Sequence, residues 1–449
     1  MILFNTSLLT YNNDRNRKTM NYSLDKNVSH LLFTLIIGLA TLGSARAQQV
    51  LQLEDCLKMA KANNNNIRAA QENVEAAKEA KQQRDIAGKP TLDGSVMGFY
   101  FGRPLNSLLP EYAVNPGVSV GQDIYSGGRT KLSRSAAAKS LEIEETRKLL
   151  TTSDVQYNTT RAYWQFVASH EQVKLARQSI KQLETLYNDF NTQYQAGIIY
   201  KNDVLRAKVQ LTESELALRR AKDALLIAED NLKQIIGISD SAYVIIADTS
   251  ISTGEALFVN AGGITTQADN AEIGILKKSL ESAEIQRQLL KAESLPSVRL
   301  GANGIMSMGK QGVNPSNNSN FLASYYGMLN VNVPIFDWGV RKRRVREQDH
   351  RINAQSLQLK DRTEQINIEL KQAYLQLDQC HQRISLTSLS LQQAGENLKL
   401  SNDRLKAGTI TGRDVLEAQT IWLQAYNNVI DAKIELKIAE ANVNRILNK

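Results

Sequence analysis

The stretch AGIIYKNDVL at residues 196–205 has a near copy, AGTITGRDVL, at residues 407–416. The match extends without a gap from 196–236 onto 407–447, and 15 of these 41 positions are identical. Self-similarity over so long a segment indicates that the chain consists of two copies of one structural unit.

The segments upstream of both copies have the composition of long helices. Residues 128–196 and 339–407 contain no proline and are rich in Leu, Ala, Gln, Glu, Lys and Arg, which favour helices. The offset of 211 residues holds through both segments, which is typical of a helix and not of a loop-rich chain. At 1.5 Å per residue each helix would be about 100 Å long, so we expect an elongated bundle or tube.

Each long helix is expected to turn back at a glycine, Gly197 or Gly408, because glycine readily adopts the left-handed conformation that ends helices. A return helix about half as long follows each turn. Another short helix precedes each long one, at 66–88 and 271–295. Two short helices stacked end to end would therefore flank one long helix and give a wall of nearly uniform thickness.

Two strand-like runs separate the short helix from the long helix in each repeat. Apolar and polar residues alternate there with a period of two, which indicates a sheet with unlike faces. A closed barrel needs about eight strands, so two chains would give a plugged barrel and three would leave room for a lumen. The alternation alone also fits a small soluble sheet capping a helical bundle. The strands are expected at about 91–103, 113–126, 297–308 and 322–336.

Residues 1–47 have the features of a signal peptide. Lys26 precedes an apolar run at 31–42, and Ala45-Arg46-Ala47 matches the small-x-small pattern of a cleavage site. Cleavage would leave Gln48 first, and because this residue is not a cysteine we expect no lipid anchor. The polar residues before Met20 are typical of an upstream start or an overlong gene.

Secretion permits insertion into the outer membrane, and the placement of aromatic residues favours it over a soluble sheet. Beyond residue 47 the apolar runs are far shorter than the roughly 20 residues of a membrane-spanning helix. Aromatic residues gather towards the loop ends of the predicted strands, as in an interfacial girdle. They are Phe99, Tyr100, Phe101, Tyr112, Tyr325 and Tyr326.

Patterns for catalysis, cofactors, metals or nucleic acid are missing from the sequence. The histidines have no ligand spacing, and Cys56 and Cys380 are expected to be unpaired thiols. Gly304–Lys310 imitates a phosphate loop, but Gln311 replaces the magnesium-binding hydroxyl residue and no helix follows. The net charge of +8 falls to +5 without the signal peptide, which holds five basic and two acidic residues, and no basic cluster is interleaved with aromatics. We therefore expect neither an enzyme nor a nucleic-acid-binding protein.

The hairpin stretch YQAG (194–197) with NDVL (202–205), and its copy at 405–419, resembles the signature of TolC-type outer-membrane efflux proteins. The resemblance covers residues 50–447 and includes the duplication and the strand exits IYSGG (124–128) and IFDWG (335–339). It implies a mainly α-helical chain with transmembrane β-strands, in a homotrimer whose 12-stranded outer-membrane barrel continues into a periplasmic α-helical barrel of 12 helices.

The same resemblance implies an export duct with no cofactor and no metal site. The duct would passively conduct substrates received from a periplasmic adaptor protein and an inner-membrane RND or ABC transporter, as part of an efflux pump or a type I secretion system. Outer-membrane lipid would surround the barrel. The identity of the cargo would depend on the transporter.

A periplasmic coiled-coil adaptor or scaffold is the principal alternative, because adaptors also combine helical hairpins with β-structure. An adaptor would gather its strands in one domain, whereas strands and hairpins alternate twice here. The predicted organisation is a signal peptide (1–47), a first repeat (48–236) with long helix 128–196 and tip 197–203, an equatorial linker (237–270), and a second repeat (271–449) with long helix 339–407, tip 408–414 and a return helix to 447.

Acidic residues just after each tip are candidates for a periplasmic aperture. In the family, residues matching Asp414 and Glu417 ring the mouth of the duct, and Asp203 occupies the corresponding place in the first repeat. Asp414 also lies three residues after Thr411, so it could instead complete a capping box at the start of a helix. An acidic ring predicts cation selectivity and block by multivalent cations.

The residues that tether the aperture in the family are replaced in this chain. Leu405 stands at the Tyr position and Ile410 at the Arg position, so any tether would use other partners, such as Arg413 or Arg206. The hairpin tips are also the surface that an adaptor would contact. The residues expected there are Gly197, Gly408, Tyr194 and Arg413.

Overall fold

The computed structural model describes residues 49–238, 244–246, 270–310, 313–314 and 316–448. By its contacts the chain separates into two units, Met1–Gln49 and Val50–Lys449. The predicted signal peptide lies outside the described residues, and so does most of the predicted linker 237–270. The helices that the structure describes and the four-stranded sheet belong to the second unit.

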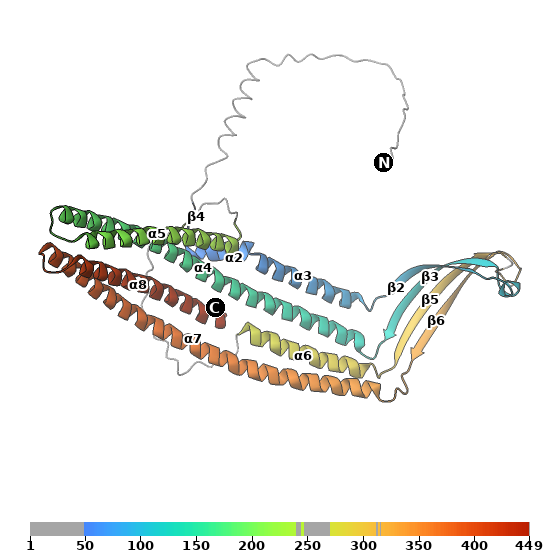
Figure 1. Cartoon of the computed structure of the whole chain (residues 1–449). Helices are drawn as coiled ribbons and strands as arrows, with labels where there is room; N and C mark the ends of the chain where they lie inside the picture. The colour runs from blue at the N-terminus through green and yellow to red at the C-terminus, as the bar shows by residue number, and fades with distance from the viewer. Residues whose placement is uncertain (1–48, 239–243, 247–269, 311–312, 315, 449) are drawn as a thin grey trace, which may run out of the picture. The chain divides into compact units, whose positions relative to one another are not determined.

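Two helices of 67 residues each dominate the second unit: α4 (Arg129–Gln195) and α7 (Val340–Lys406). Each is about 100 Å long at 1.5 Å per residue. After α4 the chain turns back into α5 (Lys201–Ile236), and after α7 it turns back into α8 (Gly412–Ile446). Each repeat therefore forms a helical hairpin with one long and one short arm (Figure 1).

Shorter helices complete a curved layer around the long ones. α3 (Asn65–Ile86) packs against α4, α6 (Ala271–Ala292) packs between α4 and α7, and α2 (Leu53–Asn63) packs against α4 and α5. The neighbours run in the order α3–α4–α6–α7 near the sheet and α5–α4–α8–α7 near the hairpin tips. One edge of the layer is therefore formed by α3 and α5, and the other by α7.

Two asparagines join the short helices end to end. The side-chain oxygen of Asn64 accepts from the backbone N–H of Asn66 (2.9 Å) and caps α3, while its amide nitrogen donates to the carbonyl of Ile235 (2.8 Å) in the last turn of α5. Asn270 repeats this arrangement between α6 and the last turn of α8, where its amide donates over 3.0 Å. One side chain thus satisfies backbone groups of two helix ends, which would otherwise lack partners.

The sheet is antiparallel with the strand order β2-β3-β5-β6. Its strands are β2 (Thr91–Tyr100), β3 (Tyr112–Tyr125), β5 (Ser297–Gly309) and β6 (Phe321–Asn332). A short 3-10 helix, η1 (Leu105–Ser107), lies between β2 and β3. In a separate two-stranded sheet, β1 (Gln49–Leu51) pairs with β4 (Val244–Ile246).

Two strands end earlier than the sequence suggests. β2 ends at Tyr100 instead of near residue 103, and β6 ends at Asn332 instead of near residue 336. A proline follows each end within four residues, Pro104 and Pro334, and proline has no N–H to donate to a strand ladder. The segment 333–336 therefore leaves the sheet before α7 begins.

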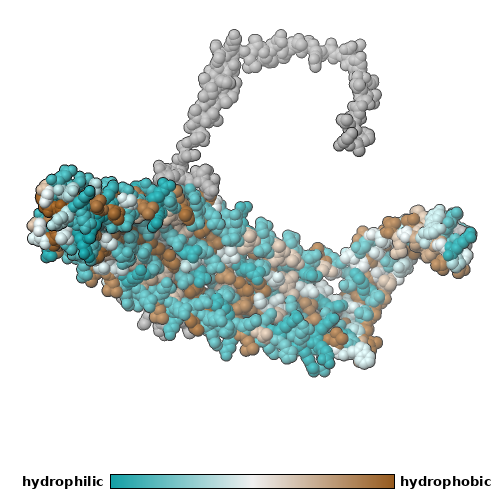
Figure 2. Space-filling view, viewed as in Figure 1, coloured by the Kyte–Doolittle hydropathy of each residue, from teal (hydrophilic) through white to brown (hydrophobic). Residues whose placement is uncertain are grey.

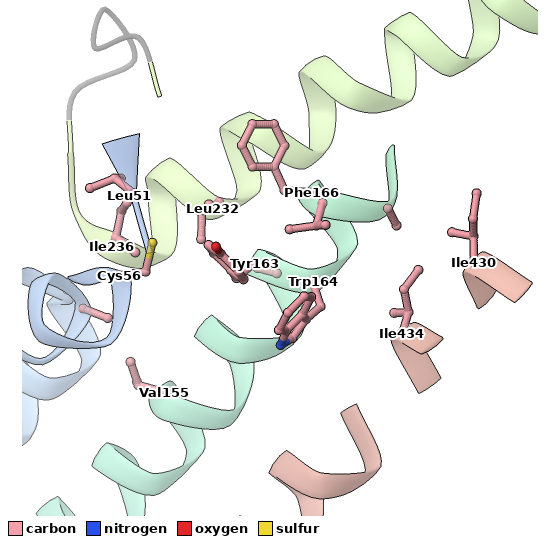
Figure 3. Close-up of a cluster of buried hydrophobic side chains, with 14 of the residues drawn as sticks. Leu51, Cys56, Val155, Tyr163, Trp164, Phe166, Leu232, Ile236, Ile430 and Ile434 are labelled. Carbon is pink, nitrogen blue, oxygen red and sulfur yellow. The ribbon is translucent and has the colours of Figure 1, made fainter. Parts of the chain in front are cut away.

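The largest hydrophobic core lies where α2, α4, α5 and α8 meet. Tyr163 and Leu232 are fully buried there, and Trp164 and Phe166 nearly so (Figure 3). Cys56 belongs to the same core, and burial raises the pKa of its thiol to about 12. Cys380 is also buried and free, so the prediction of two unpaired thiols is confirmed.

Candidate functional site at the hairpin tips and on the sheet

Both hairpin tips turn at a glycine in the left-handed conformation. Gly197 has a φ of 76° and Gly408 a φ of 72°, a region that favours glycine. No atom lies within 4 Å of the position that a β-carbon would occupy at either glycine. A larger residue would therefore meet backbone strain but no clash. Tyr194, one turn earlier, is 41% exposed, so the first tip presents an aromatic ring to solvent.

Asp414 caps the start of α8. Its carboxylate accepts from the backbone N–H of Thr411 (2.9 Å) and from the hydroxyl of Thr411 (2.8 Å). These bonds, the backbone one most strongly, hold the pKa of the Asp414 carboxyl below its usual value. Asp203 lies in the first turn of α5, which follows Tyr200, and Tyr200 makes no side-chain cap. The expected capping interaction is therefore present in one repeat only.

A groove between α5 and α8 collects charged residues next to the tips. Its volume is about 490 Å³, and its lining includes Arg206 and Glu213 from α5 and Arg413 and Glu417 from α8. Of the predicted aperture residues, Glu417 lines the groove, whereas Asp203 and Asp414 lie outside its lining. The structure thus brings both candidate tether arginines to one groove.

The two tips are joined by an aromatic contact that the sequence did not reveal. Phe190 of α4 is fully buried, and a β-carbon built on Gly412, the first residue of α8, would lie 2.5 Å from its ring. Only glycine leaves room for the ring at this position. The signal available in the sequence is a departure from the repeat: Gly412 corresponds to Lys201, and Phe190 corresponds to Ser401.

The sheet has one strongly apolar face. Residues directly opposite each other in a sheet lie on the same side, and the register aligns Leu92, Val120, Ala302 and Gly327 in one row across all four strands. Most large side chains on this side are exposed to solvent, from Val120 at 42% to Tyr325 at 89%. They are Leu92, Val96, Tyr100, Tyr112, Val114, Val118, Val120, Leu300, Met306, Met308, Phe321, Tyr325, Leu329 and Val331.

The opposite face of the sheet carries most of its polar groups. Ser307 donates to the side-chain oxygen of Asn115 (2.7 Å), and Arg299 forms an ion pair with Asp123 (3.3 Å). The prediction that the two faces of the sheet differ, made from the alternation of apolar and polar residues, is therefore confirmed. Figure 2 shows hydrophobic surface along the strands and mostly hydrophilic surface over the helices.

The edge helices α5 and α7 carry exposed apolar stripes. On α5, Leu205, Leu216 and Ile227 are 54%, 51% and 63% exposed, and on α7, Leu389 and Leu400 are 52% and 56% exposed. Neighbours in each stripe are 11 residues apart, which is about three helical turns, so each stripe runs almost straight along its helix. The stripe on α5 lies on the side away from α4, because the buried residues of α5 are on the other side.

None of the helices that the structure describes is long and apolar enough to cross a membrane.

Among the described residues, no group of three or more His, Cys, Asp or Glu side chains could hold a metal ion.

Comparison with known proteins assigns this architecture. The family described as "Outer membrane efflux protein" matches residues 56–238 and 265–449. The alkaline protease secretion protein AprF of Pseudomonas aeruginosa is 21% identical over 290 residues, which span 63% of this chain and 59% of the relative. The Campylobacter jejuni CmeC outer membrane channel superposes with a TM-score of 0.76 at 17% identity, over 97% of this chain and 94% of that one.

A third similar structure is the outer membrane protein VceC of Vibrio cholerae. Its TM-score is 0.72 at 16% identity, over 90% of this chain and 98% of that chain. The fold predicted from the repeat, with four strands and long helical hairpins in one duplicated chain, is confirmed by these likenesses.

Proposed function

The chain belongs to the outer membrane efflux protein family, and from this membership we propose that it forms a passive export duct whose sheet spans the outer membrane. The observation that carries the proposal is the apolar face of the sheet. A row of exposed Leu, Val, Met, Phe and Tyr side chains on one face is costly in water and is stable against lipid. The strands have 10 to 14 residues, enough for a tilted strand to cross a bilayer.

One chain cannot form the duct alone, because both edges of its sheet are open. β2 and β6 are the edge strands of the four-stranded sheet, and unpaired edges inside a membrane are unfavourable. Pairing β2 of one copy with β6 of the next is a head-to-tail contact, which closes into a ring. We propose a homotrimer, since three copies give 12 strands and leave space for a lumen.

The helical edges support the same contact. Leu205 and Leu216 lie 8 and 19 residues after the tip glycine of their hairpin (205 − 197 and 216 − 197), and Leu400 and Leu389 lie 8 and 19 residues before Gly408 (408 − 400 and 408 − 389). If the tips of neighbouring copies are level, the stripe on α5 of one copy meets the stripe on α7 of the next. Burial of both stripes would then stabilise the ring.

We propose that the hairpin tips form the aperture of the duct and contact its partners. Asp203, Asp414 and Glu417 would surround the periplasmic aperture, and Gly197, Gly408, Tyr194 and Arg413 would contact a periplasmic adaptor that receives cargo from an inner-membrane RND or ABC transporter. The charged groove between α5 and α8 supports this proposal, and so does the exposure of these residues, of which only Asp203 is half-buried. The alternative of a periplasmic adaptor is not favoured, because the family match covers both repeats.

Native mass spectrometry of detergent-extracted protein tests the proposal. We expect three copies as the major species, and single-channel conductance in planar bilayers. In addition, Leu216→Cys with Leu389→Cys should form disulfides between chains, while Leu216→Cys with Leu357→Cys, about 48 Å farther along α7, should not. A stable monomer without conductance would overturn the proposal.

A further inference from the structure

The segment that joins β6 to α7 exposes three large apolar side chains. Ile335, Phe336 and Trp338 are 91%, 71% and 87% exposed, and the rings of Phe336 and Trp338 lie 5.0 Å apart. Trp338 has a φ of 55°, a left-handed conformation that bulky residues rarely adopt. Neither the exposure nor the backbone strain stabilises the isolated chain, so a partner outside the chain is the simplest reason for both.

A dense cationic cluster begins three residues after Trp338. Residues 341–346 read RKRRVR, and the first turn of α7 contains no acidic residue. Arg341 pairs with Asp337 (2.6 Å) and Arg344 with Glu293 (3.4 Å). Lys342, Arg343 and Arg346 are exposed, and no carboxylate of the described residues lies within 4.0 Å of their charged groups.

Folding does not account for these three charges. Cations near the start of a helix are disfavoured by the helix dipole. The copy of this segment in the first repeat is less basic, since residues 130–135 read TKLSRS. A neighbouring copy would not neutralise them either, because the end of α3 that it would bring carries Lys81 and Arg84 against one acid, Asp85.

We infer that the β6–α7 junction binds anionic phospholipid headgroups of the membrane leaflet that faces the helices. The inference rests on the proposed function, in which the apolar face of the sheet is surrounded by lipid. That face ends at Val331, and the chain then presents apolar and aromatic side chains followed by free cations. Aromatic rings favour the membrane interface and cations next to it attract anionic lipid. Three free cations per chain would place nine around the foot of a trimeric barrel.

Lipid binding by the purified trimer tests this inference. The probes are phosphatidylglycerol and phosphatidylethanolamine, titrated into detergent-solubilised protein and counted by native mass spectrometry. The wild type should prefer phosphatidylglycerol, and added salt should weaken the preference because screening reduces charge attraction. The triple variant Lys342→Gln, Arg343→Gln and Arg346→Gln should bind phosphatidylglycerol at least about tenfold more weakly, with little change for phosphatidylethanolamine.

Two controls separate charge from general effects. Lys360→Gln, Lys371→Gln and Lys399→Gln remove the same charge from exposed positions farther along α7 and should leave the lipid preference unchanged. Trp338→Ala should weaken binding of both lipids alike, since a ring at the interface contacts hydrocarbon as well as headgroups.

Failure of the lipid-binding inference can be distinguished from failure of the proposed duct function. A triple variant that keeps its phosphatidylglycerol preference would overturn the inference, and so would an equal loss in the lysine control. A changed ion selectivity with unchanged lipid binding would instead place these cations in the lumen and also overturn it. Trimer mass and conductance report on the duct itself, and both should survive the triple substitution.

Discussion

Replacing Gly412 with alanine should destabilise the hairpin tips, although the same change elsewhere in a helix is favourable. The added β-carbon would lie 2.5 Å and 2.6 Å from two ring atoms of Phe190, roughly 1 Å short of ordinary carbon contact. The ring cannot move outwards into solvent, because it is fully buried among Val204, Ala207 and their neighbours. Overpacking of this kind costs about 1–3 kcal/mol.

Hydrogen exchange at the tip amides measures this cost directly, since local opening reports local stability. About 1.4 kcal/mol corresponds to a tenfold change, so Gly412→Ala should raise exchange at the start of α8 roughly five- to hundredfold. Gly395→Ala in α7 is the matched control: its β-carbon would lie 3.8 Å from the Trp422 ring, an ordinary contact, and the change should slow local exchange.

A second substitution tests whether Phe190 is the cause. Phe190→Leu removes the ring atoms that the new β-carbon would meet, so the double variant with Gly412→Ala should be more stable than the sum of the single effects. Slower exchange in Gly412→Ala, as in the Gly395 control, would refute the reasoning. Strict additivity of the two changes would also refute it, because it would show that the side chains do not interact.

Three further predictions concern the tips and the helix junctions. Valine at both Gly197 and Gly408 should abolish export while trimer levels stay near normal, since each substitution costs only about 1 kcal/mol of backbone strain. Efflux assays in cells measure export, and immunoblotting measures the amount of trimer. Retained export would show that tip geometry is unimportant. Asp414→Ala with Glu417→Ala should weaken cation selectivity and multivalent block in planar bilayers. Because the folded pKa of Asp414 is lowered, the cap that it makes is fully formed above the ordinary carboxyl pKa and is lost only as the pH falls through the lower folded value. Cation selectivity should therefore persist in mild acid, and loss of selectivity there would contradict the assignment. Asn64→Ala should lower stability by about 2 kcal/mol in thermal unfolding, because it removes a capping bond and a second hydrogen bond. Asn64→Asp should recover the cap alone, so wild-type stability of this variant would show that the amide donor contributes nothing.

The helices and their turns could be predicted because their causes are local. An offset without gaps between repeats requires rigid segments, and glycine at 197 and 408 has a conformational reason that depends on no distant residue. The contact of Phe190 with Gly412 could not be predicted, since it depends on how two hairpins 222 residues apart in sequence (412 − 190) pack in space. The role of Asn64 was hidden for the same reason: the polar break marks a helix end, but its second partner, Ile235, is 171 residues away.

The early strand ends show a different limit. Period-two alternation continues through Val333 and Ile335, so the pattern alone extends the strand. The proline at 334 removes a ladder donor, and backbone pairing decides where a strand ends, whatever the side-chain pattern. The released residues then form the apolar and aromatic junction ahead of α7.

The two repeats differ in the contact that holds the hairpin tips together, and this difference has a consequence for opening at the tips. If both hairpins were equivalent, a trimer would present six similar hairpins, and contacts within and between chains would have similar strength. The Phe190 ring instead seats against Gly412 within one chain, and Ser401 cannot make the reciprocal contact in the second hairpin. In the proposed trimer we therefore expect the hairpins of each chain to be held together more strongly than those of neighbouring chains. We expect any opening at the tips to separate chains as units, so that engineered disulfides between chains would block conductance while disulfides between the two hairpins of one chain would not.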